Sequence, residues 1–398
     1  MSRGGCLANN LPMGAKSQLI VAKTLFFLAN LDPLDGSAHA LYCVRNVLSL
    51  SKNAPAGWRV ELIQASHATP GEILDHHHAH ESPNLRFTAL PHIRRVKYCP
   101  IHINTVFHFS TARHLQTHAR SGDIVCTASF PELFRFVAPK AVDRGVRLVY
   151  EIHQLEILSR DGNHRKCVRE FDALSRAHQF ITTCMPLEKI LQSRFPGTPC
   201  ANLGLAASYT PVDCRPTGER PFKLGYFGSL SPEQGIPWLV QEWKKIRSMC
   251  GLDVELHVYG RARRNETGLP SDSAHGIHVH DPVPNNEVPA ESEKLSALVI
   301  PSLDQAHRAS IAFTKAYDYA GLALPILAAD LPTIREVLDD ETHALYFPPG
   351  DANALAACIS RIASEPTLAE SISANLRHLA ANLSWDSRAR RWWQAVMP

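Results

Sequence analysis

The sequence predicts an α/β protein with two doubly wound domains, each built around a parallel sheet. A chain of 398 residues is long enough for between two and three domains of ordinary size. Short runs of β-branched and large apolar residues alternate with helix-length segments, which is typical of parallel strands covered by helices on both faces. The alternation stops at a proline-rich stretch near residues 205–220 and then starts again, which predicts a second domain.

The first half contains several runs that predict buried strands, because each run is almost continuously apolar and is bounded by polar turns. The expected strands are 24–30, 59–63, 123–128, 147–152 and 179–183. Segments 38–51 and 168–178 lie between such runs and have the length and composition of helices.

The second half repeats the pattern without repeating the sequence, so the halves are not internal repeats. Its expected strands are 223–227, 254–259, 277–280, 297–300, 325–329 and 344–347. Its expected helices are 237–249, 313–319, 352–363 and 368–381. A last helix carries Trp385, Trp392 and Trp393, which we interpret as packing anchors.

Charge and cysteine content exclude several classes of protein. The chain has 41 Lys and Arg against 38 Asp and Glu, a net charge of +3, so no nucleic acid partner is expected. The 10 cysteines include no Cys-x-x-Cys pair, which indicates reduced thiols rather than a disulfide framework or a zinc site.

The longest early apolar run, 19–31, is interrupted by Lys23 and is too short to span a bilayer. A polar Asp-Pro-Leu-Asp-Gly stretch follows at 32–36, where a signal peptide would carry small residues before a cleavage site. We therefore expect a cytoplasmic protein without a transmembrane helix.

The most informative segment is 223–236, Lys-Leu-Gly-Tyr-Phe-Gly-Ser-Leu-Ser-Pro-Glu-Gln-Gly-Ile. A strand that ends at Gly228, a polar loop, and Gly235 at the start of a helix can aim backbone N–H groups at a phosphate. The alternative is an ordinary strand-turn-helix connection.

Further motifs follow in a fixed order. They are Leu-His-Val-Tyr-Gly at 256–260, Leu-Val-Ile-Pro-Ser at 298–302, Lys-Ala-Tyr-Asp-Tyr-Ala-Gly-Leu-Ala-Leu-Pro-Ile at 315–326, Ile-Arg-Glu-Val-Leu at 334–338 and Phe-Pro-Pro-Gly-Asp at 347–351. The series resembles the C-terminal half of retaining glycosyltransferases of the GT-B fold, the group related to sucrose and mannosyl transferases (glycosyltransferase family 4-like). The resemblance covers about residues 222–390 well and the first half loosely. It implies two Rossmann-like domains that face a cleft.

The resemblance also implies a nucleotide diphosphate sugar as donor, held mainly by the second domain. Asp318 matches the family's second acidic residue, which accepts hydrogen bonds from the ribose hydroxyls. Three positions depart from the family pattern, because Ser310 replaces the first acidic residue, and Ser229 and Gln234 replace the Arg and Lys that meet the diphosphate. The usual positive charges for a leaving diphosphate are therefore missing.

Lys315 offers a substitute, since it lies one helical turn before Asp318 and its ammonium can reach the same cleft. Some divergent members of the fold use a lysine at this place for the diphosphate. Arg261, directly after Tyr259-Gly260, is a second candidate. A solvated surface cation is the alternative for each.

Three residues of the first half are candidates for the acceptor side. Gly36 and Ser37 follow the first strand, where the family has a glycine-rich acceptor and phosphate loop. His153 follows a strand end, where the family carries a histidine near donor and acceptor, although a lone histidine also serves as a packing residue. Asn202-Leu203-Gly204 resembles the turn at which the family crosses between domains.

Residues 82–122 contain no Asp or Glu. They carry Arg86, Arg94, Arg95, Lys97, Arg113 and Arg120, together with Phe107 and Phe109. Such a segment can attract an anionic acceptor or an anionic membrane surface, the alternative being a solvated rim. The run His76-His77-His78-Ala79-His80 is expected to be a mobile surface loop rather than a metal site.

These observations predict a glycosyltransferase that moves a sugar to a hydroxyl of a glycan or lipid-linked glycan; the resemblance further implies that it retains anomeric configuration and uses no metal or cofactor. The alternatives are a non-catalytic sugar-nucleotide-binding or partner protein and a GT-B nucleotide-sugar epimerase. The expected location is cytoplasmic, with peripheral binding to the inner face of the membrane as a further possibility. Expected divisions are an extension (1–16), an acceptor domain (17–208), a donor domain (209–385) and a returning C-terminal helix (386–398).

Overall fold

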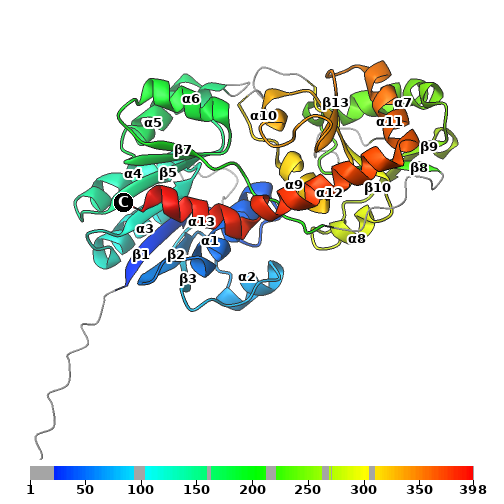
Figure 1. Ribbon diagram of the computed structural model, residues 1–398. Helices are drawn as coiled ribbons and strands as arrows, with labels where there is room; N and C mark the ends of the chain where they lie inside the picture. The colour runs from blue at the N-terminus through cyan, green and yellow to red at the C-terminus, as the bar shows by residue number, and fades with distance from the viewer. Residues whose placement is uncertain are drawn as a thin grey trace, which may run out of the picture.

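The computed structural model describes residues 22–93, 104–158, 163–211, 221–261, 269, 271–303 and 310–397. Two α/β domains lie side by side in Figure 1, and each contains one parallel sheet. The first domain runs from blue to green and the second from green to orange. The predicted fold class is confirmed.

The first sheet has seven parallel strands in the order β3-β2-β1-β4-β5-β6-β7. In chain order these are β1 (Lys23–Ala29), β2 (Trp58–Gln64), β3 (Leu85–Ala89), β4 (Ile124–Ala128), β5 (Arg147–Ile152), β6 (Gln179–Thr182) and β7 (Cys200–Asn202). Its helices are α1 (Ala38–Lys52), α2 (Pro70–His76), α3 (Asn104–His118), α4 (Pro131–Val142), α5 (His164–Leu174) and α6 (Met185–Arg194). Six of the seven residues of β1 and every residue of β4 are buried, as a sheet covered on both faces requires.

The second sheet has six parallel strands in the order β10-β9-β8-β11-β12-β13. In chain order these are β8 (Phe222–Phe227), β9 (Val254–Tyr259), β10 (Ile277–His280), β11 (Ala297–Ile300), β12 (Ile326–Ala329) and β13 (Ala344–Phe347). Its helices are α7 (Ile236–Cys250), α8 (Val288–Ser292), α9 (Thr314–Leu322), α10 (Pro332–Arg335), α11 (Ala352–Ser364) and α12 (Pro366–Leu383). Each domain has its own apolar core.

The last helix, α13 (Trp385–Val396), follows α12 and lies on the first domain (Figure 1). Trp392 and Trp393 are buried in that domain's core, in keeping with the packing role expected for them. The Trp393 indole N–H donates to the carbonyl of Leu50 on α1 at 3.0 Å. The chain therefore crosses between the domains twice, after β7 and before α13.

Two strands and several helices were missing from the expectations, and the two strands and α4 illustrate why. β3 and β7 are edge strands with partly exposed residues, so neither forms a continuous apolar run. α4 contains Pro139 in its interior and begins with Pro131, which conceals its helical pattern.

His76 ends α2 and His77 bonds the carbonyl of Pro33 at 2.8 Å, so the expected mobile loop was wrong at these two positions.

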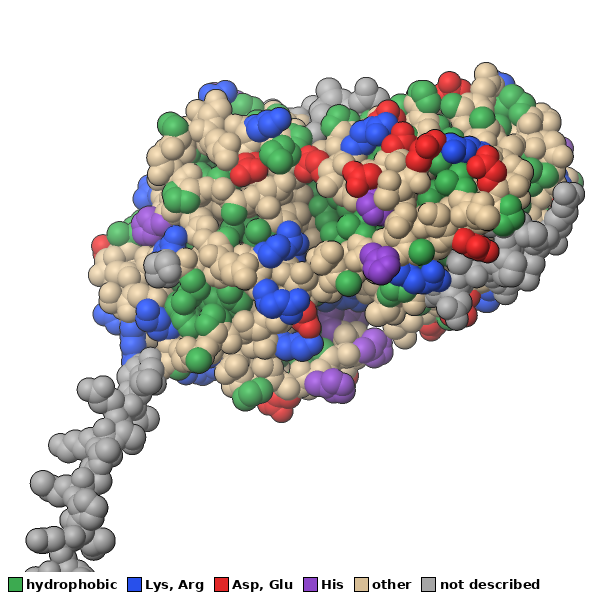
Figure 2. Space-filling view, viewed as in Figure 1, with side chains coloured by type: hydrophobic (Ala, Val, Ile, Leu, Met, Phe, Trp, Pro, Cys, Tyr) green, Lys and Arg blue, Asp and Glu red, His purple; other side chains and the backbone are tan. Residues whose placement is uncertain are grey.

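Surface composition and thiols agree with the sequence. On the face shown in Figure 2, Lys and Arg side chains are spread over both domains among acidic ones and do not gather into one basic face. The seven cysteines within the described ranges are all free thiols. Within the same ranges, no helix combines the length and hydrophobicity needed to cross a bilayer.

Candidate functional site

A cleft of about 850 Å³ lies between the two domains. The first domain contributes residues that follow β1, β4, β5 and β6, and the second contributes the ends of β8 and β9 and the start of α9. Open parallel sheets bind ligands at these carboxyl ends. Of the predicted site residues, the lining includes Gly36, His153, Gly228, Ser229, Gln234, Arg261, Lys315 and Asp318.

Lys315 lies in the first turn of α9 and reaches back over the end of β8. Its Nζ lies 3.2 Å from Oε1 of Gln234 and 5.0 Å from the centre of the Tyr226 ring. A Cβ at Gly228 would come within 2.8 Å of that Nζ, and Gly228 has a φ of 137°. Only glycine provides both this backbone conformation and the space for the ammonium. Gly228, Gln234 and Lys315 therefore form one unit at the donor side of the cleft.

The loop 228–235 offers fewer free N–H groups than the sequence suggested, because four of them bond within the protein at 2.9–3.3 Å. The donors and their carbonyl acceptors are Gly228 and Tyr259, Leu230 and Arg261, Gln234 and Ser231, and Gly235 and Pro232. In the part of the chain that the structure describes, the Ser229 amide has no such acceptor. The expected backbone cradle is therefore reduced, which leaves more of a bound diphosphate's charge to Lys315.

Gly235 and Ser310 are not in the cleft lining. A Cβ on Gly235 would lie 1.8 Å from the Pro301 carbonyl oxygen, so this glycine permits close packing of α7 against the end of β11. Ser310 is buried, and its carbonyl accepts a hydrogen bond from the Cys184 thiol. Neither position contacts the cleft as the family pattern suggested.

Asp318 lies on α9 at the point where the chain crosses between the domains. One carboxylate oxygen accepts from the Ser208 N–H at 2.9 Å, and the Ser208 carbonyl accepts from Arg45 of α1 at 3.2 Å. Burial raises the pKa of Asp318 above its ordinary value, while hydrogen bonds from Ser208 and the charge of Arg45 oppose the shift. The carboxylate thus already joins the two domains and has limited capacity left for a ribose.

His153 faces the cleft from the first domain, beside a buried carboxylate. Its ring meets Tyr42 edge to face at 4.2 Å, and its Nε2 lies 3.9 Å from Glu151. His39 stacks on Phe130, and burial together with the nearby His153 lowers the pKa of His39. Both effects favour the neutral form of the His39 imidazole on this side of the cleft.

Gly36 and Ser37 come directly after β1 and before α1. Gly36 lines the cleft, whereas Ser37 accepts a hydrogen bond from the Ala40 N–H and caps α1. A serine at this position satisfies a backbone donor that the first turn leaves open. The structure gives Ser37 a folding role and leaves Gly36 as the acceptor-side candidate.

Comparison with protein families decides the class of the second domain. Residues 221–365 match the model of a family described as Glycosyl transferases group 1. The second domain is therefore similar to a group 1 glycosyltransferase domain. This region includes Gly228, Lys315 and Asp318, and it confirms that the protein is a glycosyltransferase. No protein of curated function is a significant match to the sequence.

Solved structures of low sequence identity show the fold of the whole glycosyltransferase. Sucrose-phosphate synthase from Thermosynechococcus elongatus has a TM-score of 0.69 at 16% identity, over 94% of this chain and 98% of that chain. TarM has a TM-score of 0.69 at 10% identity, over 94% and 99%. HepE from Anabaena, in complex with UDP and glucose, has a TM-score of 0.64 at 12% identity, over 93% and 98%. These likenesses confirm a GT-B fold, and the low identities mark a divergent member.

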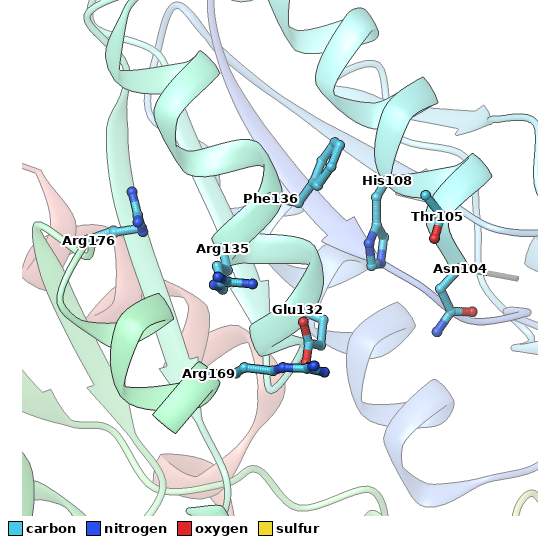
Figure 3. Close-up of a pocket in the computed structure, with 8 residues that line it drawn as sticks. All are labelled: Asn104, Thr105, His108, Glu132, Arg135, Phe136, Arg169 and Arg176. Carbon is cyan, nitrogen blue, oxygen red and sulfur yellow. The ribbon is translucent and has the colours of Figure 1, made fainter. Parts of the chain in front are cut away.

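A second cavity of the glycosyltransferase, about 550 Å³ in volume, lies among α3, α4 and α5 (Figure 3). Its lining residues are Asn104, Thr105, His108, Glu132, Arg135, Phe136, Arg169 and Arg176. Arg169 bonds Glu132 at 3.1 Å, and Asp172 pairs with both Arg135 and Arg176. The cavity therefore has a small excess of positive charge.

Residues 82–122, the segment without Asp or Glu, border this second cavity, and their side chains differ in exposure. Phe107 is buried in the core, so its predicted place at a membrane interface was wrong. Phe109 is 61% exposed and touches Phe136 edge to face at 4.8 Å. Arg86, Arg113 and Arg120 are exposed, whereas Arg94, Arg95 and Lys97 lie outside the described residues.

Several cleft residues of the glycosyltransferase were not found from the sequence. Tyr42 and His39 lie on α1, and Tyr209, which also lines the cleft, donates a hydrogen bond to Asn285 at 3.2 Å. Arg45, one turn beyond Tyr42, reaches the crossing segment at Ser208. The only sequence signal for the α1 set was the i, i+3 spacing of His39, Tyr42 and Arg45 directly after Gly36.

Proposed function

We propose that the protein transfers a sugar from a nucleoside diphosphate sugar to a hydroxyl of a glycan or lipid-linked glycan. The proposal includes retention of anomeric configuration and no metal ion at the reacting centre. The observation that carries it is the single cleft that contains Lys315 of the second domain and His153 of the first. A donor held at Lys315 and an acceptor held at His153 would meet inside that cleft.

Each part of the cleft has a chemical task in this proposal. Lys315 meets the diphosphate, whose negative charge grows as the bond to the sugar breaks. Asp318 accepts from a ribose hydroxyl beside its bond to Ser208. His153 and Gly36 position the acceptor hydroxyl. Tyr42, His39 and Phe227 reduce the access of water, which would otherwise hydrolyse the donor.

A uridine nucleotide is the first donor class to test. One structural neighbour, HepE from Anabaena, was crystallised in complex with UDP-glucose; its identity to this chain is 12% and its TM-score is 0.65. The cleft volume of about 850 Å³ lies within the range of small-molecule sites.

A nucleotide that binds the cleft should raise the melting temperature of the protein. At 100 times its dissociation constant, a ligand stabilises the folded state by about 2.7 kcal/mol. We expect one class among UDP, GDP, ADP and dTDP sugars to give such a shift, and we expect Asp318→Asn to reduce it. Asp253→Asn, on the surface beside Arg247, serves as the matched control and should leave the shift intact.

The donor site is wrongly placed if none of these nucleotides changes the melting temperature. For the nucleotide that binds, proton NMR of the first product gives the anomeric configuration, and inversion would contradict the proposal. Added Mg²⁺ or Mn²⁺ should leave the initial rate unchanged. Binding without turnover, across many acceptors, would favour a sugar-nucleotide sensor.

We also propose that the α3 and α4 surface binds an anionic membrane that presents the acceptor, at the cytoplasmic face. Phe109 and Phe136 are exposed beside Arg135, Arg169 and the second cavity. Exposed aromatic residues next to basic ones suit the membrane interface, where each basic residue contributes about 1 kcal/mol.

Vesicles of anionic lipid should therefore sediment with the protein at low salt and lose it at high salt. The double variant Phe109→Ser, Phe136→Ser should weaken this binding about tenfold. Met249→Ser, an exposed apolar residue on α7 of the other domain, is the control and should bind as the parent does. Binding that is absent, or that ignores salt and the two phenylalanines, would leave only a solvated rim.

A further inference from the structure

A cluster of imidazoles and one carboxylate lies on a single face of the β9–β10 strand pair, outside the residues that line the cleft. Side chains alternate along each strand, so Glu255, His257 and Tyr259 of β9 share one face. The parallel register pairs His257 with His278 and Tyr259 with His280. The fold therefore places three histidines and a glutamate next to one another on two hydrogen-bonded strands.

The donor atoms of three of these side chains converge. Nε2 of His257 lies 3.1 Å from one carboxylate oxygen of Glu255, and Nε2 of His278 lies 3.8 Å from the other. The three ligand atoms all lie within 4.8 Å of one another. Tetrahedral ligands about 2.0–2.2 Å from one zinc ion lie about 3.3–3.6 Å from one another, so the separations of 3.1 Å and 3.8 Å come close to those of such a site.

His278 lacks a hydrogen bond that would explain its position. Its Nε2 is buried and has no hydrogen-bond partner among the described residues. A buried polar atom left without a partner costs free energy, about 1–3 kcal/mol. A cation between this nitrogen and the Glu255 carboxylate would satisfy both groups.

His280 supplies the outer contact that metal-bound histidines commonly have. Its Nε2 lies 3.1 Å from Nδ1 of His257, the nitrogen that points away from Glu255. When Nε2 of His257 binds a metal, Nδ1 of His257 carries the proton and donates a hydrogen bond to His280. This hydrogen bond fixes the orientation of the His257 ring. His280 also stacks on Tyr259 at 4.4 Å, and Tyr259 stacks on Phe227 at 4.6 Å.

We propose that Glu255, His257 and His278 bind one divalent transition metal ion of the zinc class, with His280 as the positioning residue. Two imidazoles and one carboxylate favour such an ion over Mg²⁺ or Ca²⁺, which take oxygen ligands. Three protein ligands leave one position for water. The ion joins the edge strand β10 to β9 and supports Tyr259, which lines the donor side of the cleft.

Metal content and affinity test this proposal on the full-length protein, independently of sugar transfer. Protein freed of metal by a chelator is titrated with Zn²⁺ in a millimolar excess of Mg²⁺, and bound zinc is measured after dialysis. We expect one equivalent of Zn²⁺ and a higher melting temperature. His257→Ala and His278→Ala should each weaken binding by about 100-fold or more, and His280→Ala by about 10–100-fold.

Two controls separate this cluster from other histidines of the chain. His275→Ala changes a half-exposed histidine that pairs with Asp272 three residues before His278, and it should leave zinc affinity unchanged. The variant His76→Ala, His78→Ala removes two histidines of the other histidine-rich segment and should also bind as the parent. The proposal is overturned if the parent binds no zinc, if His257→Ala and His278→Ala bind normally, or if only the His76, His78 variant loses the ion.

Discussion

Replacing Lys315 with methionine should lower the kcat for donor turnover by about 10²–10³-fold, the cost of removing one group that stabilises developing negative charge. Methionine keeps the length and apolar stem of lysine and removes the ammonium. The ammonium is placed by the space over Gly228 and by the Gln234 oxygen 3.2 Å away. Since the loop 228–235 uses four of its own amides internally, few other groups can replace that charge.

Initial rates of nucleotide diphosphate release, with the donor saturating, measure this effect. Lys315→Arg keeps the positive charge, although its planar fork differs from a point-like ammonium, so a partial loss is expected. Lys245→Met, on the exposed face of α7, is the matched control and should keep the parental rate. The melting temperature without ligand should stay within a few degrees for all three variants. A Lys315→Met enzyme with normal kcat would show that the diphosphate lies elsewhere.

The sequence predicts the donor side of the cleft because its residues lie in short motifs, each of which can be read within one stretch of the chain. Lys315 and Asp318 lie one helical turn apart, and Gly228 ends a strand with an unmistakable apolar run. The structure brings these residues into one cavity. What the spacing could not show is how backbone groups are used, and this is why Gly235 serves packing against Pro301.

The acceptor side was less predictable because its contacts join residues far apart in the chain. Glu151 accepts a hydrogen bond from Tyr42, which is 109 positions away, and ion-pairs with Arg388, which is 237 positions away. Neither spacing produces a periodic signal. His153 was found only because it follows a strand end, and its neighbour Glu151 was overlooked as one polar residue in an apolar strand.

Edge strands and interrupted helices limited the fold prediction in the same physical way. Interior strands are buried on both faces and therefore form apolar runs that the sequence shows. The edge strands β3 and β7 lack such runs, and their positions are set by pairing with β2 and β6. The β9–β10 histidines likewise meet only through strand register, since 257 and 278 are separated by a long stretch of chain.

Arg388→Met should lower the free energy of unfolding by about 3–5 kcal/mol, the usual cost of leaving one partner of a buried ion pair without the other. Arg388 and Glu151 both have fully buried side chains. The guanidinium donates to the Gly204 carbonyl at 2.9 Å and to Asn46 at 3.0 Å, as well as to Glu151. It therefore joins α13 to α1, to β5 and to the crossing between the domains.

Urea unfolding of the parent and three variants isolates the pair. Glu151→Gln should also destabilise, because it leaves the Arg388 charge buried without its counter-ion. The double variant Arg388→Met, Glu151→Gln should lose less than the sum of the two single losses, since no uncompensated charge remains. Arg390→Met, at an exposed neighbour on α13 that bonds Asn53 at 3.3 Å, should change the free energy by less than about 0.5 kcal/mol.

The pH dependence gives an independent check on the same pair. Burial alone would raise the pKa of Glu151, but the charge of Arg388 together with the hydrogen bonds from His153 and Tyr42 outweighs burial and holds the pKa at about 2, below the ordinary value of 4.5. A carboxyl with a lowered pKa contributes stability that is complete above pH 4.5 and is lost as the pH falls towards 2. The destabilisation caused by Glu151→Gln should therefore be constant from pH 7 to about 5 and shrink in more acidic solution. A difference that vanishes already near pH 6 would mean that Arg388 does not hold Glu151 ionised, and that hydrogen bonds to Gly204 and Asn46 alone anchor α13.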